Sequence, residues 1–313
     1  MAYDHEPVLL HEVLSWLSPT LALGLPVVDC TLGGGGHSEE LLLAGATVIG
    51  IDRDQSALDA SNQRLKRFGH RFIAVKGNLR QIEKVVHEQS HEQVAAVLYD
   101  LGVSSPQLDR AERGFGFRDD APLDMRMDHS DTLRAADIVN NYSLSRLVEV
   151  IGGYGEERFA RRVAKAIVSR RSTVPFEGTR DLAEVVKAAI PAATRRTGPH
   201  PARRTFQALR LEVNQELEAL EASLQPAIDL LATGGRVAVI SYHSLEDRIV
   251  KRTFVAQAKG CICPKDLPRC ACGLLPEIRI LTHRPVRPSP VEVERNKRSD
   301  SARLRVVEKL DAA

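Results

Sequence analysis

The stretch that decides the fold is PVVDCTLGGGGHSEELLLAG, residues 26–45. Its first five residues form a short, valine-rich apolar run, which predicts a buried β-strand, and residues 38–45 after the glycines have the composition of a helix. Glycines between a strand and a helix let the backbone approach a ligand closely and leave helix N–H groups available to it. The stretch therefore predicts the first strand–loop–helix unit of a nucleotide-binding α/β domain.

The same alternation continues on both sides of this stretch. Apolar strands separated by helices of 10–15 residues indicate βαβ units and a parallel sheet. Helices are predicted at 8–17, 55–68 and 80–90, and strands at 46–52, 71–79 and 94–102. After a long helix predicted over 207–231, strand patterns return at 235–243, 278–282 and 303–310.

The central part of the chain breaks this pattern, because residues 106–205 contain almost no strand-like runs. Helices are predicted there at 144–151, 156–171 and 179–190. We therefore predict an α/β core made of residues 1–105 and 206–313, interrupted over 106–205 by a helical insert that recognises the substrate.

The insert is basic, although the net charge of the whole chain is only +2. Between Glu156 and Arg210 there are 13 Lys and Arg residues against 5 Asp and Glu residues. Segregated positive charge suits a phosphate backbone, and a merely solvated helix face is the alternative. No run of 18 apolar residues and no signal-peptide pattern occur, so we expect a cytoplasmic protein without a membrane partner.

Three aspartates end predicted strands: Asp29, Asp52 and Asp100. Ligands bind beyond the carboxyl ends of parallel strands, so these carboxylates are expected to face one crevice. Asp52 follows Gly33 by 19 residues, the position from which an acid accepts ribose hydroxyls. For Asp29, a turn or helix-capping role is the alternative.

Two adenosine-containing ligands fit a glycine loop followed by a strand-end acid. A dinucleotide site needs the spacing GxGxxG, but His37 stands where the third spaced glycine is expected. A methionine-sulfonium ligand has no pyrophosphate and fits a shorter glycine cluster preceded by an acid. The loop therefore favours S-adenosylmethionine over a nicotinamide dinucleotide.

Several long blocks of the sequence resemble one known family. The blocks are DHEPVLLHEVL (4–14), VVDCTLGGGGHS (27–38), LYDLGVSSPQLDRAERGFGFRDDAPLDMRMD (98–128), HPARRTFQALRLEVNQEL (200–217) and ISYHSLEDRIVKR (240–252). They strongly resemble the MraW/RsmH family, the N4-cytosine methyltransferases of bacterial small-subunit ribosomal RNA. The resemblance implies a Rossmann-like class I S-adenosylmethionine methyltransferase core with an inserted helical domain. It also implies a decoding-region cytidine of 16S rRNA as acceptor, within the assembled small ribosomal subunit.

The resemblance also implies which residues contact the cofactor. The family often has an aromatic residue where this chain has Leu79, beside the adenine, so leucine keeps an apolar face and loses stacking. The implied contacts are Gly35, Gly36, His37, Asp52, Leu79, Asp100 and Gln107.

The chemistry of an exocyclic amine requires a polar acceptor, because the nitrogen lone pair is delocalised into the ring and a proton must leave. Many amino-methylating enzymes have Asp/Asn-Pro-Pro-aromatic after the fourth strand, whereas this chain has DLGVSSPQ at 100–107. Asp100 or a backbone carbonyl of 103–106 is the predicted acceptor. His243 is a candidate proton relay, with a hydrogen-bonded loop-entry residue as the alternative.

Candidate substrate contacts are aromatic or cationic. Tyr242, Phe115 and Phe117 are predicted to stack on an extruded base, although a core role for one of the phenylalanines is the alternative. Candidate phosphate contacts are Arg126, Arg203 and Arg204, with an internal salt bridge as the alternative for each. The basic tail at 283–305 is expected to form a loop close to RNA.

Four of the five cysteines form two CxC pairs, Cys261 with Cys263 and Cys270 with Cys272. Four thiolates on a short loop can surround zinc tetrahedrally, although CxC is tighter than the usual CxxC spacing. Reduced thiols and a regulated disulfide are the alternatives.

Two other functions are considered for the whole chain. One is a non-catalytic RNA-binding assembly factor, which would not need an intact cofactor loop. The other is a methyltransferase that acts on DNA or a small molecule.

Overall fold

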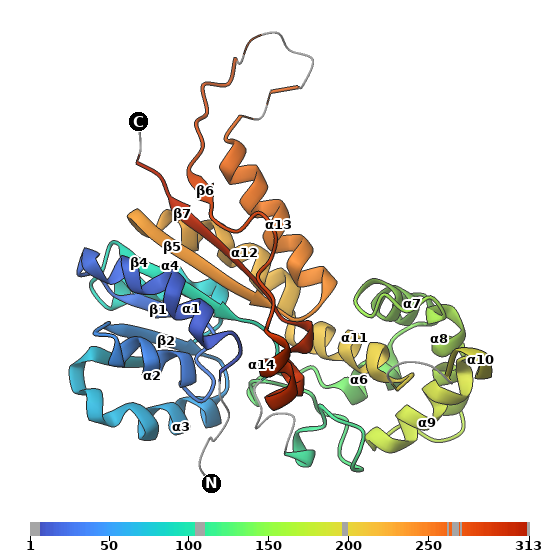
Figure 1. The fold of residues 1–313 in the computed structure, drawn as a ribbon. Coiled ribbons are helices and arrows are strands. Elements are labelled where there is room, and N and C mark those ends of the chain that lie inside the picture. Colours follow the sequence, from blue (N-terminus) through green and yellow to red (C-terminus); the bar gives the residue numbers. More distant parts are fainter. Residues whose placement is uncertain are drawn as a thin grey trace. The chain divides into compact units, whose positions relative to one another are not determined.

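A seven-stranded sheet with the strand order β3-β2-β1-β4-β5-β7-β6 organises the molecule (Figure 1). The computed structural model describes residues 7–103, 110–195, 200–261, 263–264, 269 and 271–311. Strands β1 to β5 are parallel, and β7 lies antiparallel between β5 and β6. The strand order reverses between β1 and β4, which is where doubly wound sheets bind their ligands. The predicted Rossmann-like α/β fold is confirmed.

The strands and helices lie close to the predicted positions in the α/β part. The strands are β1 (Val27–Asp29), β2 (Val48–Asp52), β3 (Phe72–Lys76), β4 (Val94–Asp100), β5 (Leu231–Ser241), β6 (Ile278–Ile280) and β7 (Arg303–Lys309). The α-helices of this part are α1 (Leu10–Leu17), α2 (Gly36–Leu43), α3 (Gln55–Leu65), α4 (Ile82–Glu88), α12 (Glu216–Asp229), α13 (Ser244–Lys259) and α14 (Pro290–Arg295).

Alternate residues of the central strands pack against different helices. Val28 and Val97 belong to the apolar cluster that includes residues of α4, α12 and α13. Val27 and Ala96 belong to the cluster that includes residues of α1 and α2. Because both faces of the sheet are covered, the strands are apolar at every position rather than at alternate positions. This explains why short valine-rich runs were sufficient to locate them.

The chain divides into two compact units, Met1–Gly102 with Leu217–Ala313, and Val103–Glu216. The second unit is helical: α6 (Ala135–Asn141), α7 (Leu144–Gly153), α8 (Ala160–Arg171), α9 (Thr179–Ala189), α10 (Ala192–Arg195) and α11 (Arg203–Asn214). Its second boundary lies later than the predicted residue 205, because Phe206, Leu209 and Val213 of α11 are part of the helical unit's own core.

The single helix predicted over 207–231 is wrong. The structure has two helices there, α11 and α12, separated at Gln215, whose φ of 49° is left-handed. Arg210 and Glu216 form an ion pair across the break, with Nε 2.9 Å from Oε1. The apolar periodicity continues through this point, so the sequence pattern gave no sign of the interruption. Pro226, by contrast, is accommodated inside α12.

Two other predicted segments also need correction. The helix predicted from 156 begins at Ala160, because Glu156 has a left-handed φ of 46°. The basic tail at 283–305 is not one loop: it contains α14, a 3₁₀ helix at Lys297–Ser301 and the start of β7. Arg305 in this tail pairs with Asp247 at 2.7 Å, so part of its charge is used within the fold. No helix in the described ranges is long and apolar enough to cross a membrane.

Candidate active site

The glycine loop connects β1 to the N-terminus of α2. Gly33 and Gly35 adopt left-handed φ values of 50° and 73°, and Gly35 is the N-cap residue of α2. A Cβ on Gly35 would lie only 2.9 Å from Cδ1 of Leu65 in α3, so the loop is tightly enclosed there. The first N–H groups of α2 therefore lie at the carboxyl edge of the sheet, where a helix has no partners of its own for them.

Asp52, the last residue of β2, accepts hydrogen bonds on both carboxylate oxygens. The N–H of Gly33 donates to Oδ2 at 2.8 Å, and the N–H of Asp54 donates to Oδ1 at 2.8 Å. Burial raises the pKa of Asp52 to about 6, although these two hydrogen bonds oppose the rise. Each oxygen still has a lone pair, so the side chain can accept two further hydrogen bonds from vicinal hydroxyls.

Asp29, the last residue of β1, holds the glycine loop in place. Its oxygens accept the hydroxyl of Ser38 at 2.7 Å and the N–H of Thr31 at 3.2 Å. The side chain is buried, and burial raises its pKa. This is the turn role considered as the alternative for Asp29, and it joins β1 to both ends of the loop.

Asp100, the last residue of β4, occupies the centre of the cluster. The hydroxyl of Tyr242 donates to its Oδ1 at 2.7 Å, and its backbone N–H donates to the hydroxyl of Thr31 at 2.6 Å. Burial raises the pKa of Asp100 to about 7, and the negative charge of Glu246 adds to the rise. A quarter of the side chain remains exposed. The carboxyl group can therefore gain or lose a proton near neutral pH.

His37, in the first turn of α2, lies beside Asp100. Its Nε2 is 3.0 Å from the carbonyl oxygen of Val8, and its Nδ1 is 3.6 Å from Oδ2 of Asp100. Donation to the Val8 carbonyl assigns the proton to Nε2, which leaves Nδ1 as an acceptor. Burial lowers the pKa of His37, so the ring is neutral. A neutral imidazole facing Asp100 does not balance the charge of the carboxylate.

The segment after β5 supplies Glu246, which the sequence did not single out. Glu246 is buried and accepts the backbone N–H of Tyr242 at 2.8 Å and that of His243 at 3.2 Å. His243 is the N-cap of α13, and its Nδ1 accepts the N–H of Glu246. Its Nε2 lies 3.2 Å from a Glu246 oxygen, at angles that do not form a hydrogen bond. The ring thus has the structural role, and we do not retain it as a proton relay.

The predicted adenine contact and the glutamine contact have different outcomes. Leu79 begins a 3₁₀ helix directly after β3 and is half-buried against the sheet's apolar cluster. It therefore presents an apolar side chain at the same edge as Asp52. Gln107 and the carbonyl groups of 104–106 lie outside the described residues.

The two phenylalanines predicted to stack on a base lie in the helical unit, Phe115 in its core and Phe117 packed against that core. Phe115 is only 7% exposed, and Phe117 packs at 4.8 Å from the ring of Phe206 and 4.6 Å from that of His200. The core role considered as the alternative for one of them applies to Phe115, whereas Phe117 is only partly buried, so its stacking on a base stays a prediction. Tyr242 remains at the candidate site, with its hydroxyl bound to Asp100.

The three predicted phosphate contacts are used differently. Arg126 forms a two-point ion pair with Asp124, at 2.8 and 2.7 Å, so its charge is satisfied within the fold. Arg204 is exposed but donates to the carbonyl oxygen of Glu156 at 2.9 Å. Arg203 is exposed, and no side-chain partner is present for it in the described part of the chain.

An exposed basic face on α8 is a better candidate for a phosphate contact. Val163 and Ile167 bury one side of this helix in the helical core. The other side carries Arg161, Arg162 and Lys165, which we call the α8 stripe. Its three side chains are exposed and have no ionic partner among the described residues. Unpaired cations one helical turn apart can contact successive phosphates.

Comparison with known proteins identifies the family. The model of the MraW methylase family matches residues 2–310. The chain belongs to this family. A relative of this methylase, Ribosomal RNA small subunit methyltransferase H of Carboxydothermus hydrogenoformans, is 50% identical over 314 residues, which cover 100% of both chains. The protein of the same name from Heliobacterium modesticaldum is 50% identical over 314 residues, covering 99% of this chain and all of its own. An rRNA methylase from Streptococcus thermophilus aligns over 99% of this chain and 100% of its own, with a TM-score of 0.44 and 12% identity.

The cofactor of this MraW methylase is S-adenosylmethionine. The charge at the candidate site fits such a cationic ligand, because Asp29, Asp52 and Asp100 end three adjacent strands and all have raised pKa values. The hydrogen-bond donors to these three carboxylates in the described part of the chain are backbone N–H groups and the hydroxyls of Ser38 and Tyr242, none of which carries a positive charge. Family membership removes the alternative of a nicotinamide dinucleotide.

Proposed function

We propose that this protein transfers a methyl group from S-adenosylmethionine to the exocyclic N4 of a cytidine in the decoding region of 16S ribosomal RNA. The small ribosomal subunit as substrate is supported by the name of the relatives that are about 50% identical over their full length. The observation that supports methyl transfer at this site is the carboxylate cluster of Asp29, Asp52 and Asp100 beside the glycine loop. We expect the enzyme to act in the cytoplasm on the assembled subunit.

In this proposal, residues of the sheet edge hold the cofactor. Asp52 accepts the two ribose hydroxyls on the lone pairs left by Gly33 and Asp54. The backbone of Gly35, Gly36 and His37 at the start of α2 contacts the remainder of the ligand, and Leu79 contacts the adenine. Gln107, from outside the described residues, is a further proposed contact. When bound, S-adenosylmethionine supplies an electrophilic methyl group.

Asp100 is the residue that we assign to the acceptor amine. An amine hydrogen bonded to a carboxylate keeps more electron density on its nitrogen, and a carboxyl group with a pKa of about 7 can take up the proton that leaves. The hydroxyl of Tyr242 fixes one oxygen of Asp100, so the other remains for the substrate. Positioning of this kind contributes much of the rate in group transfer.

The helical unit is proposed to bind the RNA backbone. The α8 stripe and Arg203 are exposed cations without described partners, and phosphate contacts need such groups. Arg126 is excluded from this role by its ion pair with Asp124.

Mass spectrometry of rRNA nucleosides tests the specific reaction. Cells that lack the gene should lose N4-methylcytidine from 16S rRNA, and the purified enzyme should restore it on small subunits from those cells. The same subunits with an Asp100→Asn enzyme should stay unmethylated. An unchanged amount of N4-methylcytidine in the deleted strain would contradict the cytidine assignment, whereas donor binding by calorimetry tests the methyltransferase site independently.

A further inference from the structure

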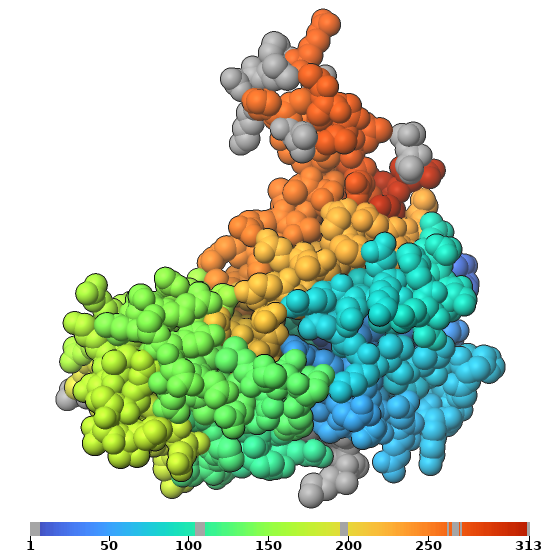
Figure 2. Space-filling view, turned by 180° about the vertical axis from the view of Figure 1, so that it is seen from behind, coloured from blue at the N-terminus to red at the C-terminus, as the bar shows by residue number. Residues whose placement is uncertain are grey.

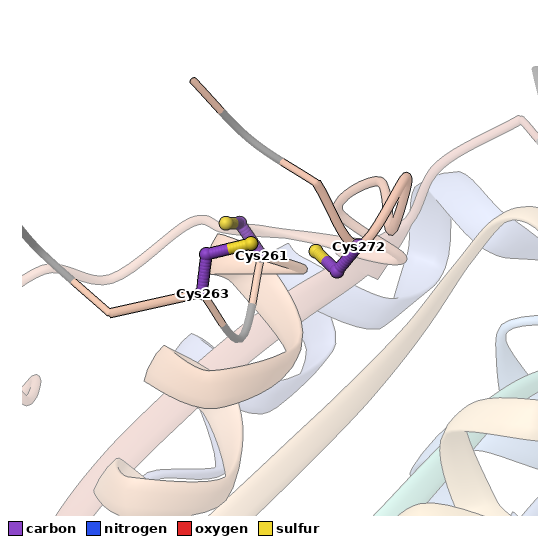
Figure 3. A group of neighbouring side chains, drawn as sticks. All are labelled: Cys261, Cys263 and Cys272. Carbon is purple, nitrogen blue, oxygen red and sulfur yellow. The ribbon is translucent and has the colours of Figure 1, made fainter. Parts of the chain in front are cut away.

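A second cluster of reactive side chains lies between α13 and β6. Cys261, Cys263 and Cys272 are in the described part of this segment, and their sulfur atoms all lie within 4.8 Å of one another. Figure 3 shows the three sulfur atoms gathered between the chain that leaves α13 and the chain that returns toward β6. No disulfide joins any two of these three cysteines.

The spacing of the sulfur atoms suits a metal ion. Zinc binds thiolate sulfur at about 2.3 Å in tetrahedral sites, which places the sulfur atoms about 3.8 Å apart. A triangle with sides of at most 4.8 Å contracts to that size through small rotations about the cysteine Cα–Cβ bonds. A disulfide, by contrast, could use only two of the three sulfur atoms.

The backbone brings the two halves of the cluster together without help from the sulfur atoms. Gly260, the C-cap residue of α13, has a φ of 64°, and a Cβ there would overlap the carbonyl group of Leu275. The N–H of Glu277 also donates to the carbonyl oxygen of Gln257 at 3.1 Å. Cys261 and Cys272 are therefore held on facing segments, which is the preorganisation that a metal site needs.

Little apolar packing holds this segment. Its described residues after Gly260 and before β6 form neither helix nor strand, and Leu274 and Leu275 are 48% and 60% exposed. In the space-filling view, the segment that follows α13, in orange, stands out at the top of the surface (Figure 2). Segments that bury too little apolar surface to order themselves are commonly ordered by a metal.

Charge at the end of α13 also favours a cation. The carbonyl groups at the C-terminus of a helix carry partial negative charge. Cys261 lies only two residues after Lys259, the last residue of α13. Cysteines bind zinc as thiolates, and the positive charge of the bound ion would offset their negative charge beside that helix end. Soft sulfur ligands select zinc over magnesium or calcium.

We propose that Cys261, Cys263 and Cys272 bind a structural zinc ion that fastens the segment between α13 and β6. The site is separate from the carboxylate cluster, and methyl transfer uses no group from it. A tetrahedral site has a fourth position, for which Cys270 is the sequence-predicted ligand, outside the described residues.

Elemental analysis of the full-length protein, purified without chelators, tests the site. We expect about one zinc per chain, and less than about a tenth of that after Cys263→Ser, because loss of one thiolate from a tetrahedral site weakens binding severely. Cys30→Ala is the matched control: Cys30 is buried beside β1, and its removal should leave the zinc content unchanged.

Cobalt substitution gives a second readout that does not depend on activity. The cobalt-loaded protein should show thiolate-to-cobalt charge-transfer absorption in the near ultraviolet, and Cys263→Ser should abolish it. Retained binding of S-adenosylhomocysteine by that variant would show that it is folded. The proposal is overturned if the wild-type protein contains no zinc, if it contains iron instead, or if both Cys261→Ser and Cys263→Ser retain a full equivalent.

Discussion

Replacement of Asp100 by Asn should stabilise the ligand-free protein in a pH-dependent way. Asn is isosteric and keeps an oxygen that can accept the hydroxyl of Tyr242, which lies 2.7 Å from Oδ1. It removes only the ionisation. Burial raises the pKa of Asp100 from 3.8 to about 7, so the folded protein resists the charged form.

The sign and size of the effect follow from this shift. Below the unfolded-state pKa, Asp100 is protonated in both the folded and the unfolded protein, so its ionisation does not change the free energy of unfolding. As pH rises, the unfolded chain loses its proton first, so the wild-type protein loses stability until ionisation in the folded state is complete above pH 7. Between about pH 5 and pH 8 the wild type should lose about 2.5 kcal/mol relative to the variant, which is about 4 °C in Tm for a protein of this size.

Thermal unfolding of both proteins at the two pH values, without ligand, measures this difference. Because the variant and the wild type are compared at the same pH, the titration of the other groups cancels from the difference in Tm. Asp229→Asn, on the exposed side of α12, is the control and should show no change with pH beyond the wild type. The reasoning is refuted if the Tm difference between Asp100→Asn and the wild type is equal at both pH values.

Three further predictions concern ligands. S-adenosylmethionine should bind more tightly as pH rises through 7, because its positively charged sulfonium favours the ionised form of Asp100. S-adenosylhomocysteine, whose sulfur is uncharged, should show a weaker pH dependence of Kd by calorimetry. Equal pH dependences for the two ligands would refute a role for the charge of Asp100. Asp52→Ala should weaken binding of either ligand about 10- to 100-fold, because it removes the carboxylate that accepts the ribose hydroxyls and leaves the N–H of Gly33 without a hydrogen-bond acceptor. An unchanged Kd would exclude the ribose contact. Replacement of the α8 stripe by alanines should weaken binding to the small subunit and lower the salt dependence of that binding by about one ion per lost phosphate contact. Lys84→Ala, at a lysine that already pairs with Glu88, is the control. An unaltered salt slope would exclude the stripe as a phosphate contact.

The α/β fold and the positions of the acids could be predicted because they depend on local pattern. Buried parallel strands are continuous apolar runs, so their ends, and hence Asp29, Asp52 and Asp100, were located from residues adjacent in sequence. The break at Gln215 could not be predicted, since the apolar period does not change there, although α11 and α12 contribute to different apolar cores.

The partners of the site residues could not be predicted, because they come from distant parts of the chain. The hydroxyl of Tyr242 reaches Asp100 across 142 positions, and no sequence pattern couples the two. For Arg126, the structure shows the internal salt bridge that the sequence left open as the alternative, and its partner, Asp124, lies only two positions away. The capping box of His243 with Glu246 was visible in the sequence as an acid three residues after the cap, and it was overlooked.

The hydrogen bond from the N–H of Leu9 to Glu292 in α14, 2.8 Å long, has a consequence for biosynthesis. Leu9 follows Val8, whose carbonyl oxygen accepts a hydrogen bond from His37, so a segment that contacts the candidate site is also bonded to a helix that is synthesised almost last. While the polypeptide is still emerging from the ribosome, this segment lacks its hydrogen bond to α14. A nascent chain arrested before residue 292 should therefore bind S-adenosylmethionine poorly, even though its glycine loop has already been translated.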